Sequence, residues 1–319
     1  MNILCPGISA WSWMPQRPQQ MLRAAARAGH RCFYVEPGSG SAMREVEPNV
    51  MVVGDLAEAQ RETGAYVLYF TDPTTQVGRL RAGPVIFDAV DDFPGWEAAL
   101  AEASRAADHV VCTSAGVQAR LAEAGIAATL IPNACDYAHW SAAPDGPPPV
   151  EVDVLPRPLA VFIGAVAQWV DIALVAACAE AAPGAAFALV GPHLTTDYHA
   201  AKCPPNVWAF GFRPYAAIPA FAHAADVLLL PFREDVREAQ AANPVKLWEY
   251  LATGRPVVST RIPEVLPLHP LVRAASGQAF VGAVVKALDQ DDGLEDARRS
   301  VAAANTWDER WRQVEVCLG

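Results

Sequence analysis

The chain lacks long apolar stretches, although 52% of its 319 residues are hydrophobic. No uninterrupted apolar run reaches the length of about 18 residues that a membrane-spanning helix needs. The first residues, MNILCPG, also lack the basic start, apolar core and cleavage site of a secretory signal peptide. We therefore expect a soluble protein in the cytoplasm.

Positive charge is scarce as well. The chain has 24 Lys and Arg against 35 Asp and Glu, a formal net charge of −11, and no basic cluster. A nucleic-acid partner is not expected, because phosphate backbones are bound by clustered Lys and Arg. The acidic charge also limits any membrane contact to a peripheral one, although a lipid-linked acceptor could be reached through the loop around Trp11 and Trp13.

Patterns that would indicate a metal or a dinucleotide are missing too. The seven cysteines are scattered without a CxxC pair, and the seven histidines form no HExxH motif. Neither a disulfide framework nor a metal site is expected. Gly7, after the first apolar run, is followed by Ile-Ser-Ala-Trp and not by a GxGxxG motif, which disfavours a dehydrogenase.

The sequence does contain a regular alternation of short apolar runs and helical stretches. This pattern is typical of a parallel sheet flanked by helices. Helices are predicted over 16–28, 96–107 and 115–124, the last of them capped by the hydroxyl of Ser114. Strands are predicted over 3–5, 32–35, 50–53, 67–70, 85–87, 109–112 and 129–131.

A proline-rich segment, APDGPPPVEVDVLPRP, interrupts the alternation and predicts an interdomain linker over 141–158. The alternation resumes in LAVFIG, FALVG, VWAFG, VLLLPF and PVVST, which predict a second parallel sheet. We therefore expect an α/β protein with two doubly wound, Rossmann-like domains facing a cleft, over 1–140 and 159–290. Helices over 291–319 are expected to pack back on the first domain.

The most informative segment is NPVKLWEYLATGRPVV. Asn243 is a suitable N-cap, Pro244 suits the first helical position, and Gly254 can end the helix. A helix N-terminus attracts anions, and Lys246 one turn in adds a full positive charge, so a diphosphate would fit there. Glu249, a further turn along, could accept two hydrogen bonds from a ribose diol. A capped surface helix with a Lys–Glu pair explains the same residues equally well.

This segment resembles the donor-binding signature of bacterial GT-B glycosyltransferases, the group-one, family-four-like type that builds cell-surface polysaccharides. Further segments follow the order found in those enzymes, among them WSWMPQRPQQMLRAAARAGHRCFYVE, FDAVDDFPGW, IPNACDYAHW, FALVGP and GFRPYAAIPAFAHAADVLLLPF. The resemblance thus extends over nearly the whole chain. It implies the GT-B fold and transfer of a sugar from a nucleotide-sugar donor.

The resemblance implies that Glu249 holds the donor ribose and that Lys246, with the helix start, contacts the diphosphate. The chain departs from the family pattern in two places. Many relatives have a second glutamate where this chain has Ala241, and an Arg and Lys pair where it has GAVAQWVD. Recognition of the donor sugar is therefore in question, and Lys246 has little help in neutralising the diphosphate.

Three more donor-binding residues are expected in the second domain. Gly164 and Gly191 end apolar strands, where a glycine lets the backbone approach a ligand, or simply ends the strand. Arg213 follows VWAFG, where the related enzymes place the nucleotide base, and could stack on that base or meet a phosphate. A solvated arginine is the competing interpretation.

The first domain offers two groups of polar residues. Gln16 and Arg17 precede Pro18 at a helix start, which favours phosphate or acceptor binding, or else a polar helix start with packed tryptophans.

Asp88, Asp91 and Asp92 follow the apolar run PVIF, which is predicted to be a strand. The loop at the carboxyl end of such a strand normally faces the ligand. Asp88 is assigned to acceptor or phosphate binding. Asp91 beside Asp92 is a candidate general base, since a like-charged neighbour raises a carboxyl pKa. Alternatively, Asp91 caps the next turn and Asp92 pairs with an arginine.

We predict a metal-independent, hexosyltransferase-like enzyme that needs no cofactor and uses a nucleoside-diphosphate sugar as co-substrate. Its acceptor would be a sugar, a lipid-linked molecule or a small molecule, in polysaccharide or glycoconjugate biosynthesis. Lys246 would stabilise the charge that grows on the leaving diphosphate. The relatives imply retention of anomeric configuration, with the phosphate taking the acceptor proton, whereas inversion would need Asp91 or Asp92 as the base.

Two other functions fit the same residues. A nucleotide-sugar epimerase of the same fold would make a new nucleotide sugar. A non-catalytic nucleotide-sugar-binding subunit, which Ala241 favours, would make no product at all.

Overall fold

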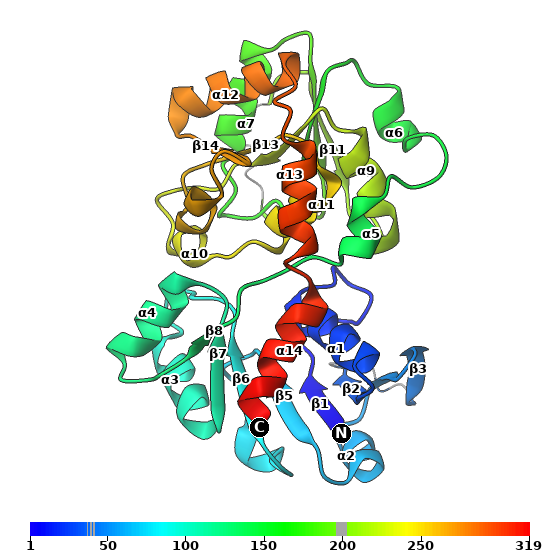
Figure 1. Ribbon diagram of the computed structural model, residues 1–319, viewed down its shortest axis with the longest axis vertical. Helices are drawn as coiled ribbons and strands as arrows, with labels where there is room; N and C mark the ends of the chain where they lie inside the picture. Colours follow the sequence, from blue (N-terminus) through cyan, green and yellow to red (C-terminus); the bar gives the residue numbers. More distant parts are fainter. Residues whose placement is uncertain (37, 39, 41, 196–202) are drawn as a thin grey trace. The chain divides into compact units, whose positions relative to one another are not determined.

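The computed structural model describes residues 1–36, 38, 40, 42–195 and 203–319. The chain divides into two compact units. Unit 1 consists of Met1–Ala134, Ala241–Asn243 and Thr306–Gly319, and unit 2 of Cys135–Gln240 and Pro244–Asn305. Both are mixed α/β units with a sheet between helices (Figure 1).

Unit 1 is built on an eight-stranded sheet in the order β3-β4-β2-β1-β5-β6-β7-β8. All neighbouring strands are parallel except β3 and β4. The predicted strands are all present. The edge strand β3 is additional, and it was not predicted because its sequence, REVE, is largely polar. The bounds are β1 Asn2–Pro6, β2 Arg31–Val35, β3 Arg44–Glu47, β4 Val50–Val53, β5 Val67–Phe70, β6 Val85–Ala89, β7 His109–Cys112 and β8 Thr129–Leu130.

The helices of unit 1 cover this sheet. Ser114 caps α4 as predicted, since its hydroxyl oxygen accepts a hydrogen bond from the Val117 N–H at 3.1 Å. The C-terminal helix α14 packs on α1 (Figure 1). The bounds are α1 Arg17–Arg27, α2 Leu56–Thr63, α3 Glu97–Ala106, α4 Ala115–Glu123 and α14 Trp307–Leu318, with a short 3-10 helix η1 at Val77–Arg79.

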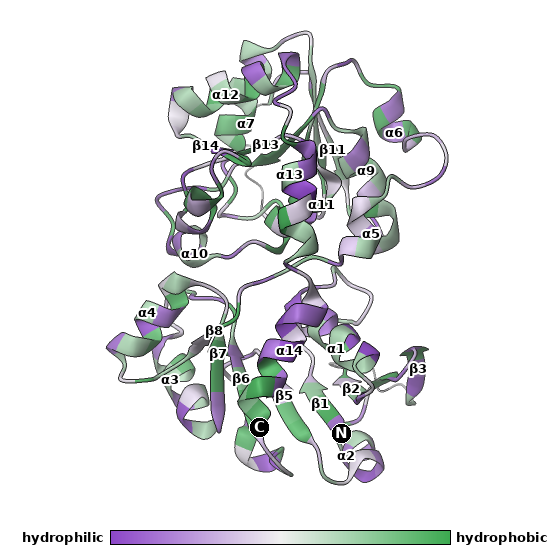
Figure 2. Cartoon of the chain, in the orientation of Figure 1, coloured by the Kyte–Doolittle hydropathy of each residue, from purple (hydrophilic) through white to green (hydrophobic). Residues whose placement is uncertain are grey.

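Unit 2 has a six-stranded parallel sheet in the order β11-β10-β9-β12-β13-β14. The five predicted apolar runs form five of these strands, and the short edge strand β14 is additional. In Figure 2 central strands such as β1 and β5 are green, that is hydrophobic, whereas the edge strand β3 is largely purple. The bounds are β9 Leu159–Ile163, β10 Ala186–Val190, β11 Val207–Gly211, β12 Val227–Leu230, β13 Val257–Ser259 and β14 Val272–Ala274.

Helices of unit 2 pack on both its sheet and one another. Helix α11, from the NPVKLWEYLATGRPVV segment, lies against α13, α5 and α9. The bounds are α5 Tyr137–Ser141, α6 Val150–Asp153, α7 Ile172–Ala181, α9 Ile218–Ala224, α10 Arg237–Ala241, α11 Val245–Thr253, α12 Gly277–Asp289 and α13 Glu295–Ala303, with 3-10 helices η2 Tyr215–Ala217 and η3 Pro263–Leu268. The last residue of α10, Ala241, groups with unit 1.

The boundary between the units differs from the predicted linker over 141–158. Unit 2 begins at Cys135, so the proline-rich segment belongs to it. The reason is burial: the side chains of Trp140 and Val152 both lie in the core of unit 2. Of the helices predicted over 291–319, α13 groups with unit 2 and only α14 with unit 1.

Both sheets change winding direction at one strand. In unit 1, β2 and β5 flank β1, and in unit 2, β10 and β12 flank β9. Open α/β sheets bind ligands at the carboxyl ends of strands next to such a switch point. The doubly wound fold class predicted from the sequence is thereby confirmed, and each unit has one edge at which a ligand is expected. Among the described residues, no helix is both long and apolar enough to cross a membrane.

Candidate functional site

Helix α11 begins one residue later than the sequence predicts. Pro244 is its N-cap and supplies no side-chain acceptor, so the prediction of Asn243 as the N-cap is wrong. The Oδ1 atom of Asn243 instead accepts a hydrogen bond from the Asn133 N–H at 3.1 Å, within unit 1. Gly254 ends the helix with a φ of 80°, as predicted. The first N–H groups of α11 therefore have no side-chain cap, which suits an anion.

The apolar face of α11 fixes the helix on the sheet of unit 2. Leu247, Tyr250 and Leu251 are completely buried. The hydroxyl oxygen of Tyr250 accepts a hydrogen bond from the Ile163 N–H, at 2.8 Å, at the end of β9. The opposite, polar face of α11 is thus held at the carboxyl end of the strand where the sheet changes direction.

Lys246 lies close to that switch point. Its Nζ lies 4.7 Å from the ring centroid of Phe162, in β9, and 5.2 Å from that of Phe232, just after β12. Within the described part of the chain, Nζ makes no hydrogen bond and has no carboxylate within salt-bridge distance. Desolvation lowers the pKa of Lys246 to about 8, against the opposing effect of the Glu249 charge. An ammonium held only by two aromatic faces is suited to meet an anion.

Gly164 makes room for this ammonium. A Cβ at position 164 would lie 2.2 Å from the Nζ of Lys246, and the φ of +134° is strained for any other residue. Gly191 is needed for a similar reason, because its Cβ would lie 2.1 Å from the carbonyl oxygen of Gly164. Gly164 and Gly191, which were predicted to bind the donor, therefore allow the strand ends and Lys246 to lie close together. The sequence pattern did not indicate this role.

Glu249 lies one turn after Lys246 and is 7% exposed. Desolvation raises the pKa of its carboxyl to about 8, and Lys246 opposes this rise. The charge of Asp136 raises the pKa further, whereas a hydrogen bond from Tyr215 lowers it. Buried carboxylates need hydrogen-bond donors, and ribose hydroxyls would supply them.

The remaining donor-side residues are held by the protein itself. The guanidinium of Arg213 donates to the carbonyl oxygens of Phe210, at 2.6 Å, and Phe212, at 2.9 Å, and pairs with Glu151 at 3.2 Å. Ala241, where the resemblance leads us to expect a glutamate, is buried in unit 1, and its carbonyl oxygen accepts a hydrogen bond from the hydroxyl of Ser114.

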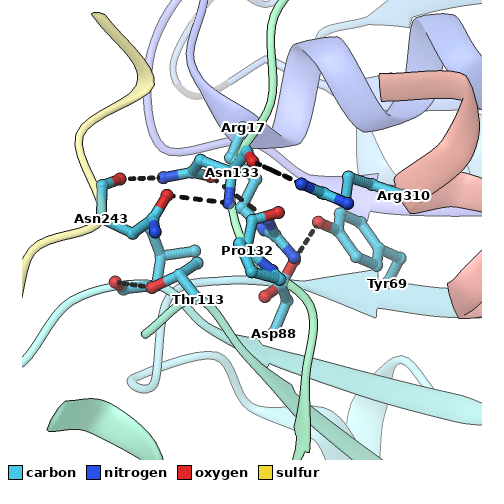
Figure 3. A network of polar contacts seen from close by, with 9 residues as sticks. Arg17, Tyr69, Asp88, Thr113, Pro132, Asn133, Asn243 and Arg310 are labelled. Atoms are coloured by element: carbon cyan, nitrogen blue, oxygen red, sulfur yellow. Dashed lines mark hydrogen bonds and ion pairs between the residues drawn. The ribbon is translucent and has the colours of Figure 1, made fainter. Parts of the chain in front are cut away.

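At the switch point of unit 1, the polar residues of a cluster are joined to one another by hydrogen bonds and an ion pair (Figure 3). Arg17, the first residue of α1, is 1% exposed, and its Nε donates to Oδ2 of Asp88, in β6, at 2.6 Å. The same Oδ2 accepts a hydrogen bond from the hydroxyl of Tyr69, in β5. The NH1 group of Arg17 donates to Pro132 O and Asn133 Oδ1, each at 3.1 Å. A solvated phosphate-binding role for Arg17 would require this cluster to open.

Asn133 joins this cluster to two other segments of unit 1. Its N–H and side-chain amide donate to Oδ1 and to the carbonyl of Asn243, and its own carbonyl accepts from Arg310 of α14 at 3.4 Å. Sequence reasoning missed Asn133, although it stands in the IPNACDYAHW segment. Nothing in a single sequence indicates that three distant segments meet at that residue.

Two polar atoms of the cluster have no partner among the described residues. They are the NH2 of Arg17 and the Oδ1 of Asp88, both buried. Gln16, in contrast, is exposed at the start of α1, where its N–H donates to Oε1 of Gln19 at 3.1 Å. Of the predicted phosphate- or acceptor-binding residues Gln16 and Arg17, only Gln16 is thus accessible. The charges of Arg17 and Asp88 neutralise each other.

The other two aspartates differ from each other. Asp92 is buried and its carboxylate lies 3.7 Å from the guanidinium of Arg120, which is the alternative left open for it. Asp91 is exposed as a residue, but surrounding protein atoms desolvate its carboxyl and, with the charge of Asp88, raise its pKa to about 6. The neighbour that raises this pKa is therefore Asp88 and not the adjacent Asp92.

A cavity of about 590 Å³ lies elsewhere in unit 1. Its lining comes from the amino ends of strands, the edge at which parallel α/β sheets rarely bind ligands. None of the candidate site residues lines it. The lining residues are Met1, Asn2, Gly29, Arg31, Ala65, Tyr66, Val67, Gly83 and Pro84.

Comparison with known proteins shows what the chain is similar to. Residues 157–290 match the family described as glycosyl transferases group 1. A Bacillus subtilis (strain 168) protein named as a teichuronic acid biosynthesis glycosyltransferase, TuaH, is 27% identical over 168 residues. That alignment covers 50% of this chain and 42% of the relative, so the chain matches less than half of that protein's length.

Solved structures are similar over nearly the whole chain. Sucrose-phosphate synthase from Thermosynechococcus elongatus has a TM-score of 0.77 at 13% identity and covers 98% of this chain and 97% of its own. HepE of Anabaena, in complex with UDP-glucose, has a TM-score of 0.74 at 15% identity, with 100% and 99% covered. An α,α-trehalose-phosphate synthase (UDP-forming) from Burkholderia xenovorans, in complex with glucose-6-phosphate, has a TM-score of 0.74 at 12% identity, with 100% of both chains covered. The GT-B fold and the resemblance read from the sequence are confirmed.

Proposed function

We propose that the protein is a glycosyltransferase whose unit 2 binds a nucleoside-diphosphate sugar. The observation that carries this proposal is the position of Lys246. Its ammonium lies at the switch point of the sheet, next to an uncapped helix start, and is held by the rings of Phe162 and Phe232. A positive charge with no carboxylate partner beside free N–H groups is suited to a diphosphate.

The ribose of the donor is assigned to Glu249. Its buried carboxylate lies one helical turn beyond Lys246, so a nucleotide with its diphosphate on Lys246 places a diol within reach of it. Gly164 and Gly191 keep the strand ends free of side chains where the donor approaches. Arg213 is given no ligand contact, because three of its five N–H donors already bond to Phe210, Phe212 and Glu151.

The proposed reaction is a single group transfer. The bond between the anomeric carbon and the diphosphate oxygen breaks, and the acceptor oxygen forms a new bond to that carbon. Lys246 and the start of α11 stabilise the negative charge that accumulates on the leaving diphosphate, a role for which the chemistry needs no metal ion. With retention of configuration the departing phosphate takes the acceptor proton, and with inversion the carboxylate of Asp91 does so.

The acceptor is assigned to unit 1. Asp91 is the accessible carboxylate at that edge, and its raised pKa favours proton transfer near neutral pH. Gln16 is the accessible polar group at the start of α1. The relative named for teichuronic acid biosynthesis supports a sugar-containing acceptor in polysaccharide biosynthesis.

The experiment is an analysis of products by liquid chromatography and mass spectrometry. The purified protein is incubated with UDP-, GDP-, ADP-, CDP- and dTDP-sugars, each with and without a mixture of sugars and sugar phosphates. A transferase releases the nucleoside diphosphate and forms a glycoside when an acceptor is present, or free sugar slowly when none is. An epimerase would convert one nucleotide sugar into another, and a binding subunit would leave all of them unchanged.

Lys246→Met serves as the negative control for these incubations. We expect it to release no nucleoside diphosphate above background while it keeps the fold of the wild type in circular dichroism. Release at the wild-type rate by this variant would contradict the assigned role of Lys246.

A further inference from the structure

Tyr215 is held by three contacts within unit 2. Its ring stacks on the ring of His139, with centroids 4.6 Å apart and planes at 26°. Its carbonyl oxygen lies 3.3 Å from Nε2 of the same histidine. Its hydroxyl oxygen accepts a hydrogen bond from Nε1 of Trp140 at 3.0 Å. Because Trp140 is 1% exposed, the position of the tyrosine hydroxyl is fixed by a rigid neighbour.

A side-chain hydrogen bond from Tyr215 also acts on the carboxyl of Glu249 and lowers its pKa. A tyrosine hydroxyl has one hydrogen to donate and lone pairs to accept with. Since the indole of Trp140 already donates to this oxygen, the hydroxyl hydrogen is directed at Glu249. A chain of two hydrogen bonds therefore runs from the buried indole through the tyrosine to the carboxylate.

We propose that Tyr215 is a positioning residue that holds the carboxylate of Glu249 ready to accept the two hydroxyls of the donor ribose. This inference rests on the proposed function, in which Glu249 binds that ribose. A carboxylate that is already oriented loses less side-chain freedom when the nucleotide binds. The hydrogen bond also favours the ionised carboxylate, which is the form that accepts two hydrogen bonds.

The inference gives a role to the segment IPNACDYAHW. Its helix α5 supplies both rings that hold Tyr215, those of His139 and Trp140. The helix itself is capped by Asp136, whose carboxylate accepts a hydrogen bond from the His139 N–H at 3.3 Å. On this inference the segment supports the nucleotide site by holding Tyr215.

Only some of the ionisable groups on the elements around Glu249 act on its carboxyl. Lys246 on the same helix and Asp136 before α5 both act on its pKa. The groups of the two remaining helices that pack on α11 lie elsewhere. They are His223 of α9, which contacts the Trp140 carbonyl, Arg298 and Arg299 of α13, which donate to Gly254 and Thr253 at the far end of α11, and Glu295 of α13, which pairs with Arg299.

The test measures the dissociation constant of a nucleoside diphosphate between pH 6 and 10 by isothermal titration calorimetry. The probe is whichever of ADP, GDP, CDP, UDP and dTDP binds the wild type most tightly. Tyr215→Phe keeps the ring and removes only the hydroxyl. Tyr137→Phe is the matched control, because Tyr137 lies on α5 and its hydroxyl makes no hydrogen bond to any residue that the structure describes.

For Tyr215→Phe we expect the dissociation constant at pH 7 to rise about tenfold. We also expect the acidic side of the pH profile, where Glu249 becomes protonated, to move up by about one pH unit. A purely structural role would weaken binding equally at every pH, so an unmoved acidic side would overturn the inference. Trp140→Phe, which keeps the tyrosine hydroxyl, should give a smaller shift in the same direction.

Glu249→Ala separates this inference from the proposed function. If Glu249→Ala binds the nucleotide as the wild type does, the donor site itself is wrong and the inference falls with it. If Glu249→Ala loses binding while Tyr215→Phe keeps the affinity and pH profile of the wild type, only the role of Tyr215 is overturned.

Discussion

The two units place charged residues at equivalent points of two similar sheets, yet these residues are satisfied in opposite ways. In unit 1, Arg17 begins the helix that follows β1, the strand where the winding changes, and it binds Asp88 of β6, two strands away, at 2.6 Å. In unit 2, Lys246 lies next to the corresponding strand and is held by two aromatic rings. A buried pair of opposite charges needs no ligand, whereas a partly buried charge without a counterion does.

The comparison also shows that position in the sheet does not by itself identify a binding site. Both clusters stand where open α/β sheets bind ligands. The number of partners that the protein itself supplies separates them, and it points to unit 2 for the phosphate groups. The following predictions test this contrast in order of expected effect.

The largest effect is expected from breaking the pair in unit 1. Asp88→Asn leaves the guanidinium of Arg17 buried without its counterion, which should lower the free energy of unfolding by about 3–5 kcal/mol. Lys246→Met removes a charge that has no such partner, and should change stability by less than about 1 kcal/mol. Urea unfolding followed by tryptophan fluorescence compares the two, and equal losses would remove the contrast.

In catalysis, the larger loss is expected for Lys246→Met and the smaller one for Asp88→Asn, the reverse of their order in stability. Lys246→Met removes the positive charge from the leaving diphosphate and should lower kcat/KM for the donor by about 10²–10³-fold. The assay is release of nucleoside diphosphate at 25 °C. The matched variant Lys246→Arg keeps the charge and should lose less activity than Lys246→Met.

A smaller effect is expected from the glycine that seats the lysine. Gly164→Ala forces a side chain into a backbone with a φ of +134° and to within 2.2 Å of the Lys246 Nζ. We expect a loss of about 1–3 kcal/mol in the free energy of unfolding, together with weaker nucleotide binding. Gly184→Ala is the control, since a Cβ there meets nothing within 4 Å. Similar losses in both variants would show that the site at Gly164 is not special.

The pH dependence of nucleotide binding should reflect the lowered pKa of Lys246, about 8. A bound diphosphate favours the charged lysine, so the contribution of Lys246 to the affinity is complete below this pKa and is lost as the pH rises above it. The dissociation constant should increase by at most about tenfold per pH unit, because one proton is involved. Calorimetric titration from pH 7 to 10 measures this, and Lys246→Arg should abolish the alkaline fall.

The smallest effect is expected at Arg213. Its guanidinium is used by two carbonyl oxygens and by Glu151, so Arg213→Ala should change the nucleotide dissociation constant less than about twofold. A tenfold loss of affinity in the same calorimetric measurement would mean that this arginine leaves its ion pair for the ligand.

Local sequence patterns predicted most of the fold. Apolar runs such as LAVFIG and FALVG form buried strands, and Ser114 caps its helix by accepting a hydrogen bond from the N–H of Val117, three residues further along the sequence. The errors occur where distant segments compete for a residue. Asn243 is a good cap by itself, but it bonds to Asn133, which is 110 residues earlier.

The candidate site was predicted in part for the same reason. Lys246 and Glu249 share a helix, so their relation follows from helical spacing. Tyr215 and Phe162 come from other elements, and only the folded chain shows that they reach Glu249 and Lys246. The pairing of Arg17 with Asp88 likewise joins α1 to β6, across 71 residues of sequence.

The most direct test of the central claim is thermal stabilisation by nucleoside diphosphates and nucleotide sugars, measured on the wild type, Lys246→Met and Glu249→Ala. Asp92→Asn in unit 1 is the control. We predict that one base gives a clear rise in Tm with the wild type and the control, and that both unit 2 variants lose it. No rise with any nucleotide, or a rise that survives in both unit 2 variants, would contradict the assignment of the donor site to Lys246 and Glu249.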